Sequence, residues 1–299
     1  MELIDSIRGI YLDNPSIVYV YVALLGLFMG SFINVVAARL PLIMHREYQE
    51  EIKEYLEENG GTCDFENKKT LPKTLWGRSE CPHCGHKISA LENIPIISYL
   101  ALRGKCKGCS SRISIKYPIV EILTSTLSIL VVVYNGISVD TLLGLAFVWL
   151  MIPAVLIDFE ELVLPDSMNF MLLWIAILTA LVGRGVTLEE AVLGAVAGYL
   201  SLWSIYWAFK LATGKEGMGY GDFKLMSALG AILGPLSLPY IGLIAVIVSI
   251  AVMMLAKWTY KGNKAIPFGP GLAVSGFILF MVQSGMDIPI LDYLLKGVV

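Results

Sequence analysis

Residues 141–158 read TLLGLAFVWLMIPAVLID, an apolar run with no charged residue before Asp158. A helix needs roughly 20 mostly apolar residues to cross a bilayer. The whole chain shares this character, because 56% of its 299 residues are hydrophobic and 16% are charged. A soluble domain usually has about 45–50% apolar and roughly 25% charged residues. The composition therefore predicts a membrane protein and argues against a soluble enzyme or a disordered regulator.

Similar apolar runs recur on both sides of this stretch, and together they predict an all-α polytopic membrane protein with about eight transmembrane helices. The expected spans are 17–38, 116–134, 141–157, 168–183, 189–209, 223–236, 238–257 and 268–284. A charged segment, 45–58, follows the first span and predicts a separate surface helix that ends at Asn59-Gly60-Gly61.

The lysines and arginines are distributed unevenly between the two sides of the membrane in this predicted topology. Residues 39–116 hold 13 of the 22 lysines and arginines, and two shorter loops on the same side hold 6 more, which leaves 3 for the opposite side. Basic loops face the cytoplasm. The pattern predicts cytoplasmic loops after the first, fifth and seventh spans, with both termini outside. The net charge of −3 offers no basic surface for nucleic acid.

Four of the five cysteines form two pairs in the first loop, Cys81-Pro-His-Cys84 and Cys106-Lys-Gly-Cys109. Paired C-x-x-C segments at about this spacing indicate a zinc site. Four thiolates close the coordination sphere, so the predicted role is structural. Two disulfides or a redox pair are the alternatives, and a reducing cytoplasm disfavours disulfides. Gly85 and Gly108 are expected to give the turns their freedom, and Cys63 stands apart.

Three acids lie at or near the ends of predicted spans, namely Glu121, Asp158 and Asp222. Ionisable groups at membrane depth are costly and point to function. Asp158 and Asp222 both lie at the cytoplasmic ends of their predicted spans, so they can converge on one site. Two close carboxylates share a proton, and one can then act as a base while the other acts as an acid. Ordinary interfacial acids are the alternative. Asp166 follows Leu164-Pro165 and is expected to cap the next helix.

A second class of function fits the same composition, a transporter with a zinc-clamped cytoplasmic domain. Its membrane acids would bind ions near the middle of the bilayer, at the interface of repeated halves. No repeat is visible in this sequence, and the two acids lie at one face.

An ordered set of motifs along most of the chain resembles the type IV prepilin peptidases of bacterial inner membranes, which also serve type II secretion. The set comprises GSFINV (30–35), RLP (39–41), both cysteine pairs with NIPIISYLALRGKC (93–106), IS (113–114), YPIVE (117–121), ID (157–158), LPD (164–166) and GMGYGDFK (217–224). The GxGD element also resembles presenilin-type intramembrane aspartyl proteases. The segment from about 44 to 70 is the least similar to the family.

The resemblance implies two activities and the residues for one of them. The enzyme would cut the leader from prepilins and pseudopilins at the cytoplasmic face, with Asp158 and Asp222 as the catalytic pair. It would then methylate the new N-terminal amine with S-adenosylmethionine. No glycine-rich nucleotide-binding fingerprint in the first loop marks the residues that bind this methyl donor.

The same resemblance divides the chain into three parts. These are a periplasmic N-terminus with the first helix (1–38), a cytoplasmic zinc-binding domain (39–115) and a membrane-embedded aspartyl peptidase (116–299). Gly217, Gly219 and Gly221 are expected to make strand-like contacts with the substrate, since glycine lets backbones approach closely. Glu121 is a further candidate for positioning the substrate.

Overall fold

The structure is a computed structural model that describes residues 11–61, 74–259 and 267–286, without the side chains of residues 255–259. These ranges contain no β-strand, only the two isolated bridges Glu80–Lys87 and Lys105–Arg112. Cys63 lies outside the described residues.

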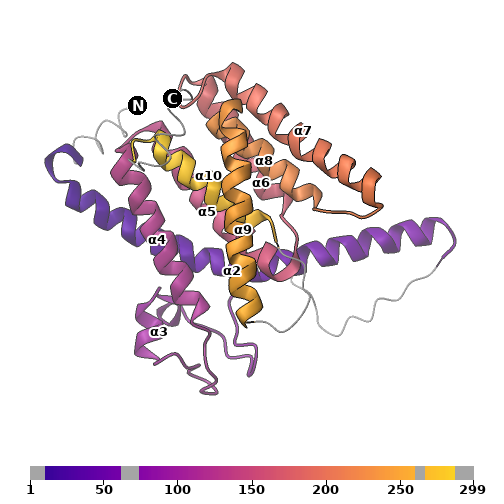
Figure 1. Ribbon diagram of the computed structural model, residues 1–299. Coiled ribbons are helices and arrows are strands. Elements are labelled where there is room, and N and C mark those ends of the chain that lie inside the picture. Colours follow the sequence, from indigo (N-terminus) through magenta and orange to yellow (C-terminus); the bar gives the residue numbers. More distant parts are fainter. Residues whose placement is uncertain (1–10, 62–73, 260–266, 287–299) are drawn as a thin grey trace. The chain divides into compact units, whose positions relative to one another are not determined.

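Helices make up most of the described chain (Figure 1). In chain order they are α2 (Pro15–Glu58), the short turn η1 (Leu91–Asn93), α3 (Ile97–Ala101), α4 (Lys116–Asn135), α5 (Val139–Glu161), α6 (Asp166–Leu181), α7 (Leu188–Thr213), α8 (Tyr220–Leu233), the short turn η2 (Pro235–Ser237), α9 (Leu238–Thr259) and α10 (Gly269–Gln283). Every predicted span overlaps one of the longer helices, which confirms the all-helical membrane fold.

Within the described part of the chain, five segments are long and apolar enough to cross a membrane by themselves. They are α2, α4, α5, α7 and the segment Pro235–Met254, which contains most of α9. The other apolar helices, α6, α8 and α10, have 16, 14 and 15 residues. A full crossing takes roughly 20 residues. The number of complete spans therefore stays a prediction.

The separate span and surface helix expected at the start of the chain are one helix. Helix α2 runs for 44 residues and contains Pro41. A proline inside a helix costs one backbone hydrogen bond and some strain, and the good helix formers on both sides carry the helix past it. The predicted end is confirmed, because Gly60 takes a φ of +76° and the Gly61 N–H bonds to the Leu56 carbonyl at 2.8 Å.

The chain divides into two compact units. The first, here called the helical unit, contains the residues up to Gly26 and those from Thr124 onward. The second, here called the knuckle unit, contains Leu27–Leu123 and both cysteine pairs. Each unit is described by itself below.

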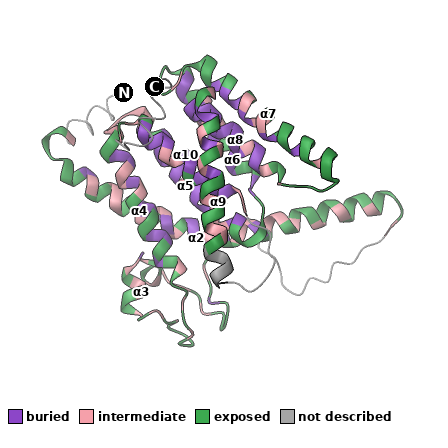
Figure 2. Ribbon diagram, viewed as in Figure 1, coloured by how far each residue is buried: buried purple, intermediate pink, exposed green. Residues whose placement is uncertain are grey.

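Helix α8 lies at the centre of the helical unit, in contact with α6, α7 and α10 (Figures 1 and 2). From Asp222 to its end only Lys224 is not fully buried. Its contact with α7 is backbone to backbone, because a Cβ added at Gly194 would lie 2.0 Å from the Gly230 carbonyl oxygen. Gly198 meets Met226 in the same way. The small residues of α7 therefore serve packing within this chain.

Side-chain caps fix where two of the long helices begin. At the start of α5 the Ser138 hydroxyl accepts the Thr141 N–H at 3.2 Å. At the start of α7 Thr187 and Glu190 form a reciprocal capping box, at 3.2 and 2.9 Å. These caps define where the loops that lead into α5 and α7 end.

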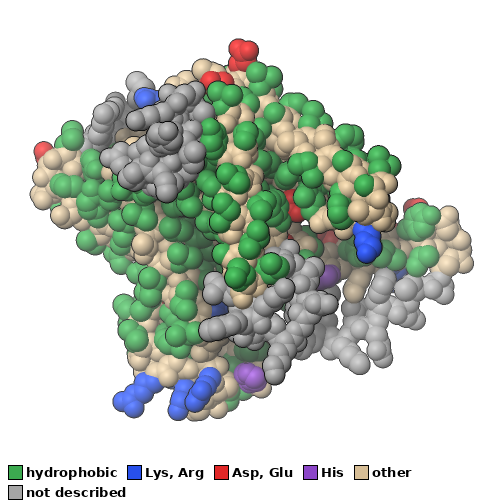
Figure 3. All heavy atoms as spheres, in the orientation of Figure 1, with side chains coloured by type: hydrophobic (Ala, Val, Ile, Leu, Met, Phe, Trp, Pro, Cys, Tyr) green, Lys and Arg blue, Asp and Glu red, His purple; other side chains and the backbone are tan. Residues whose placement is uncertain are grey.

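The outer surface of the helical unit is apolar. Large hydrophobic side chains are exposed along α5, α6, α7 and α9, among them Trp174 at 60% and Ile247 at 58%. Figure 3 shows many green hydrophobic side chains along α7 and α9, which face the viewer. A soluble protein rarely exposes such continuous apolar area, so this surface is suited to lipid.

Candidate active site and metal centre

Asp158 lies in the last turn of α5, where the helix is about to end. Its side chain is buried and its Oδ2 atom accepts the backbone N–H of Gly269 at 3.1 Å. The helix stops because Leu162 takes a left-handed conformation, with φ of +57°, and its N–H bonds back to the Asp158 carbonyl. The end of one helix and the start of α10 therefore hold this carboxylate together.

Asp222 lies in the first turn of α8 and is also buried. Its Oδ2 atom accepts the N–H of Gly219, the residue at the N-terminal cap, at 3.2 Å. An acid at this position is stabilised by the free N–H groups and the dipole of the helix. The position in the helix thus fixes the direction of the side chain.

The two carboxylates lie near each other within the helical unit. Their charges are close enough to interact. Leu164 contacts both the start of α8, which carries Asp222, and the start of α10, which binds Asp158, since added Cβ atoms at Gly221 and Gly269 would meet this leucine at 2.8 and 2.9 Å. Each carboxylate therefore has one backbone N–H donor, a nearby carboxylate and an apolar wall. Whether the pair is catalytic is taken up as a proposal below.

The glycine segment before α8 differs in part from the expected strand. Gly217 is non-helical, and Gly219 has an extended backbone with φ of −82° and ψ of 154°. Gly221, however, lies inside the first turn of α8. A Cβ atom at Gly221 would clash with Leu164, so helix packing requires a glycine at this position. Only the residues before Tyr220 are therefore placed to make strand-like contacts.

Two residues of α6 hold the start of α8, and the sequence did not assign them this role. Asp166 was expected to cap α6, but the helix begins at this residue and its cap is Pro165. Its carboxylate instead pairs with Lys224 at 2.5 Å. Asn169 is buried and donates to the Gly221 carbonyl at 3.4 Å, while its own Oδ1 atom has no partner. The polar Asn169 within an apolar run was the available signal.

The four paired cysteines converge in the knuckle unit. Their sulfur atoms all lie within 4.8 Å of one another. The Cys81–Cys109 and Cys84–Cys106 sulfur distances are 3.9 and 4.0 Å. Zinc bound by four sulfurs at about 2.3 Å would separate them by about 3.8 Å. The donor set therefore fits a tetrahedral metal ion such as zinc.

Each cysteine pair lies in a tight turn. In the first turn the Gly85 N–H bonds to the Cys81 carbonyl at 2.9 Å, and Gly85 has a φ of +68°. In the second turn the equivalent residue is Ser110, with φ of +59°. The expectation that Gly108 supplies turn freedom is therefore wrong. Gly108 is needed for space, because an added Cβ would lie 3.3 Å from the Cys84 sulfur.

Local hydrogen bonds favour the thiolate form of two of the four cysteines, whereas burial and the neighbouring cysteines raise the pKa of Cys84 to about 12. Backbone N–H groups of His83 and Cys84 lower the pKa of Cys81 to about 6. The Ser111 hydroxyl lowers the pKa of Cys109. Thiolate is the form that binds metal. His86, which follows the first cysteine pair, lies 3.0 Å from the Glu92 carboxylate.

Glu121 belongs to the knuckle unit, whereas Asp158 and Asp222 belong to the helical unit. It lies in α4 and is buried, and its carboxylate accepts the Ile96 N–H at 2.8 Å. Helix α2 passes very close at this level, since an added Cβ at Gly30 would lie 2.6 Å from the Glu121 Cα. Its predicted part in positioning the substrate stays a prediction.

Two family models match consecutive parts of the chain. The bacterial peptidase A24 N-terminal domain matches residues 24–135, and the type IV leader peptidase family matches residues 145–254. The first match includes both cysteine pairs, and the second includes Asp158 and Asp222. No solved structure gives a significant match to the chain.

Curated relatives match nearly the whole chain. A prepilin leader peptidase/N-methyltransferase from Aeromonas hydrophila is 45% identical over 89% of this chain and 91% of its own length. Proteins of the same name from Dichelobacter nodosus and Pseudomonas aeruginosa are 44% and 42% identical, each over 94% of both chains. Together with the two family matches, this likeness shows that the chain belongs to the type IV leader peptidase family.

Proposed function

We propose that this chain removes the leader of prepilins and pseudopilins with Asp158 and Asp222, and that it then N-methylates the new N-terminus. Membership of the leader peptidase family and the name shared by the relatives support both activities. The transporter alternative is not supported, because the matching family models and relatives are peptidases.

One observation carries the peptidase proposal. Two buried carboxylates, Asp158 and Asp222, lie within electrostatic reach of each other. Two negative charges in an apolar site are costly, so one carboxyl group holds a proton while the other is ionised. This is the arrangement that lets one acid take a proton while its neighbour gives one.

The reaction follows from this shared proton. The ionised carboxylate takes a proton from water as the water oxygen bonds to the scissile carbonyl carbon, and the protonated partner stabilises the carbonyl oxygen. When the carbon–nitrogen bond breaks, the departing nitrogen receives a proton and leaves as a free amine. The Gly219 and Gly269 N–H groups hold one oxygen of each aspartate throughout. Only the remaining oxygens are needed for proton transfer.

The substrate must be extended where it is cut, because helical peptide bonds are internally hydrogen-bonded and shielded. The backbone before α8 is non-helical from Gly214 to Gly219. It offers N–H and carbonyl groups next to Asp222. We infer that this segment binds the residues around the cleavage site. The pilin helix that follows would lie against the apolar outer surface of the helical unit, and the basic leader would stay in the cytoplasm.

Orientation in the bacterial inner membrane follows from charge. The cytoplasm is assigned to the side of the basic loops. Lys210 and Lys215, which flank the loop before Asp222, are on that side. We therefore propose that the aspartate pair faces the cytoplasm.

A zinc ion in the four-cysteine cluster would be structural. The cluster has four thiolates, which fill a tetrahedral site and leave no position for water. The ion would fix the two turns of the knuckle unit relative to each other. Cys81, Cys84, Cys106 and Cys109 would hold it.

The decisive experiment uses purified enzyme, a purified prepilin, S-adenosylmethionine and mass spectrometry. We expect the wild type to give a loss the size of the leader and a gain of one methylene. Asp158→Asn and Asp222→Asn should each leave the prepilin uncleaved, since removing a catalytic group costs about 10³-fold or more. The exposed Asp13→Asn protein is the matched control and should cleave normally. Normal cleavage by either of the two site variants would refute the assignment.

A further inference from the structure

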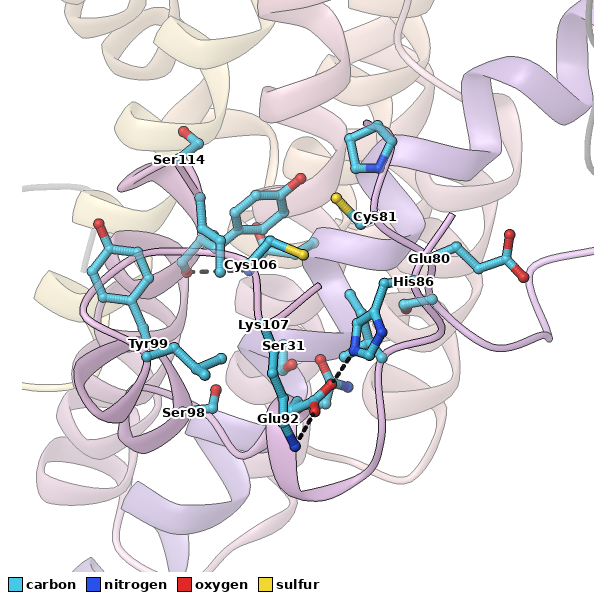
Figure 4. A pocket seen from close by; sticks show the side chains of 18 of the residues that line it. Ser31, Glu80, Cys81, His86, Glu92, Ser98, Tyr99, Cys106, Lys107 and Ser114 are labelled. Atoms are coloured by element: carbon cyan, nitrogen blue, oxygen red, sulfur yellow. Dashed lines mark hydrogen bonds and ion pairs between the residues drawn. The ribbon is translucent and has the colours of Figure 1, made fainter. Parts of the chain in front are cut away.

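The knuckle unit contains a cavity of about 480 Å³. Its walls come from α2, both cysteine turns, the segment around α3 and the start of α4. Figure 4 shows the cavity from close by, with the side chains of Tyr99, Glu92 and His86 around it. Small-molecule sites commonly measure about 300–1,000 Å³. The cavity is therefore large enough for a nucleoside-sized ligand.

The most informative group in the cavity wall is the Glu121 carboxylate. Glu121 is 7% exposed, accepts the Ile96 N–H at 2.8 Å and is also hydrogen-bonded to Ser31. Among the described residues no cation forms an ion pair with it. A buried charge normally has a counter-charge. The missing partner of Glu121 is therefore expected to arrive with the ligand.

Another acid in the same wall shows the contrast. Glu92 already pairs with Lys107 at 3.2 Å and with His86 at 3.0 Å, as the dashed lines in Figure 4 mark. These contacts lower the pKa of Glu92 to about 2, with the His86 hydrogen bond as the largest cause. Glu92 is satisfied within the protein, whereas Glu121 lacks a counter-charge.

A strained residue points to the same place. Ile96 has a φ of +62° and lines the cavity. A β-branched residue in this region is a real outlier that costs about 1–3 kcal/mol. The Glu121 carboxylate holds the Ile96 N–H in this conformation. Strain of this kind is concentrated at binding sites, where it fixes the shape of a ligand pocket.

The rest of the wall offers the other groups that an amino-acid nucleoside needs. Tyr99 and Tyr117 line the cavity and have flat aromatic faces, on which a purine ring stacks. Arg112 also lines it and forms no ion pair with a described residue. A guanidinium of this kind suits a carboxylate.

We propose that this cavity binds S-adenosylmethionine and that Glu121 pairs with its positive charge. The inference rests on the proposed N-methyltransferase activity. S-adenosylmethionine carries a sulfonium, an ammonium, a carboxylate and an adenine ring, and the cavity has a partner for each kind of group. An adenine nucleotide such as ATP brings only negative charge to Glu121 and is expected to bind poorly.

In methyl transfer, Glu121 would only hold the methyl donor in place. The sulfur–methyl bond breaks as the nitrogen–methyl bond forms, the bonding electrons return to sulfur, and the amine loses a proton to water. Glu121 takes no atom from either reactant. It acts as a binding group for the donor.

The test compares full-length, zinc-loaded wild type with Glu121→Gln. Glutamine keeps an oxygen for the Ile96 N–H, removes the charge and replaces the other oxygen with an amide NH2 group. The matched control is Glu54→Gln, an exposed acid of the same unit that is not in the cavity wall. We expect Glu121→Gln to bind S-adenosylmethionine about 10- to 100-fold more weakly, the range for loss of a charge-assisted contact. The bound zinc of Glu121→Gln should equal that of the wild type, which shows that the knuckle unit is folded. Unchanged affinity in the Glu121→Gln protein would overturn the inference.

A second measurement needs no variant. Ultraviolet cross-linking of labelled S-adenosylmethionine to the wild type should place the label within residues 31–39 or 79–121, and labelling elsewhere would overturn the site. If the wild type cleaves prepilin but neither binds nor methylates, the proposed methyltransferase activity itself has failed. That result differs from one in which methylation occurs and Glu121 is irrelevant.

Discussion

Gly269 offers the sharpest test of how the aspartate pair is held. Its N–H donates to the Asp158 Oδ2 atom at 3.1 Å, and a Cβ added at this residue would lie 2.5 Å from the same oxygen. Ordinary contact begins at 3.4 Å. The Gly269→Ala change must therefore move the carboxylate, or the start of α10, by 3.4 − 2.5 = 0.9 Å. A misplacement of about 1 Å can cost about 100-fold in rate.

We expect Gly269→Ala to cleave prepilin about 100-fold more slowly in steady-state assays. Methylation of a pilin peptide that already lacks its leader should persist, which separates a displaced carboxylate from an unfolded protein. Gly242→Ala is the control, because an added Cβ there meets nothing within 4 Å. A Gly269→Ala protein that cleaves at more than half the wild-type rate would refute the reasoning, since the carboxylate would then tolerate the shift.

Three further predictions concern packing, metal and charge. Gly194→Ala should lower the free energy of unfolding by about 1–3 kcal/mol, measured by thermal unfolding in detergent, because its Cβ would lie 2.0 Å from a backbone oxygen of α8; stability equal to Gly242→Ala would contradict the close packing. Cys106→Ser should lose bound zinc in metal analysis while some aspartyl cleavage remains, and full zinc content would exclude this cluster as the site. Glu92→Gln should unfold at a lower temperature than wild type at pH 7. The pKa of Glu92 is lowered to about 2 in the folded protein, so the ionised side chain stabilises the fold above about pH 4.5. This difference should shrink as the pH falls from about 4.5 to 2, and a difference that grows in acid would contradict the ion pairs.

The sequence predicted the elements well where the signal is local. Apolar length located the helices, and Gly60 marked the end of α2 because only a residue that accepts positive φ can stop a helix in that way. The prediction failed between 38 and 45, where the chain continues as one helix through Pro41. A single proline is a local penalty that the helix on either side can outweigh.

The cysteine pairs illustrate how a motif can be right for a partly wrong reason. Their spacing predicted a four-sulfur cluster, and the sulfurs converge. Both Gly85 and Gly108 were expected to give the turns their freedom, yet in the second turn Ser110 takes the left-handed conformation and Gly108 provides room beside Cys84. Spacing reports which atoms can meet, whereas backbone dihedral angles depend on how the two turns pack.

By itself the sequence determined the membrane character and the helical class and marked Asp158 and Asp222 as candidates, because apolar length and charge are properties of the chain alone. Only the tertiary structure decided what surrounds these groups. It gave Asp158 the N–H of Gly269 from another helix, gave Asp222 the N–H of Gly219, and left Glu121 buried without a described cation. Such partners lie far apart in sequence or depend on burial, so they are fixed when helices pack and not by local pattern.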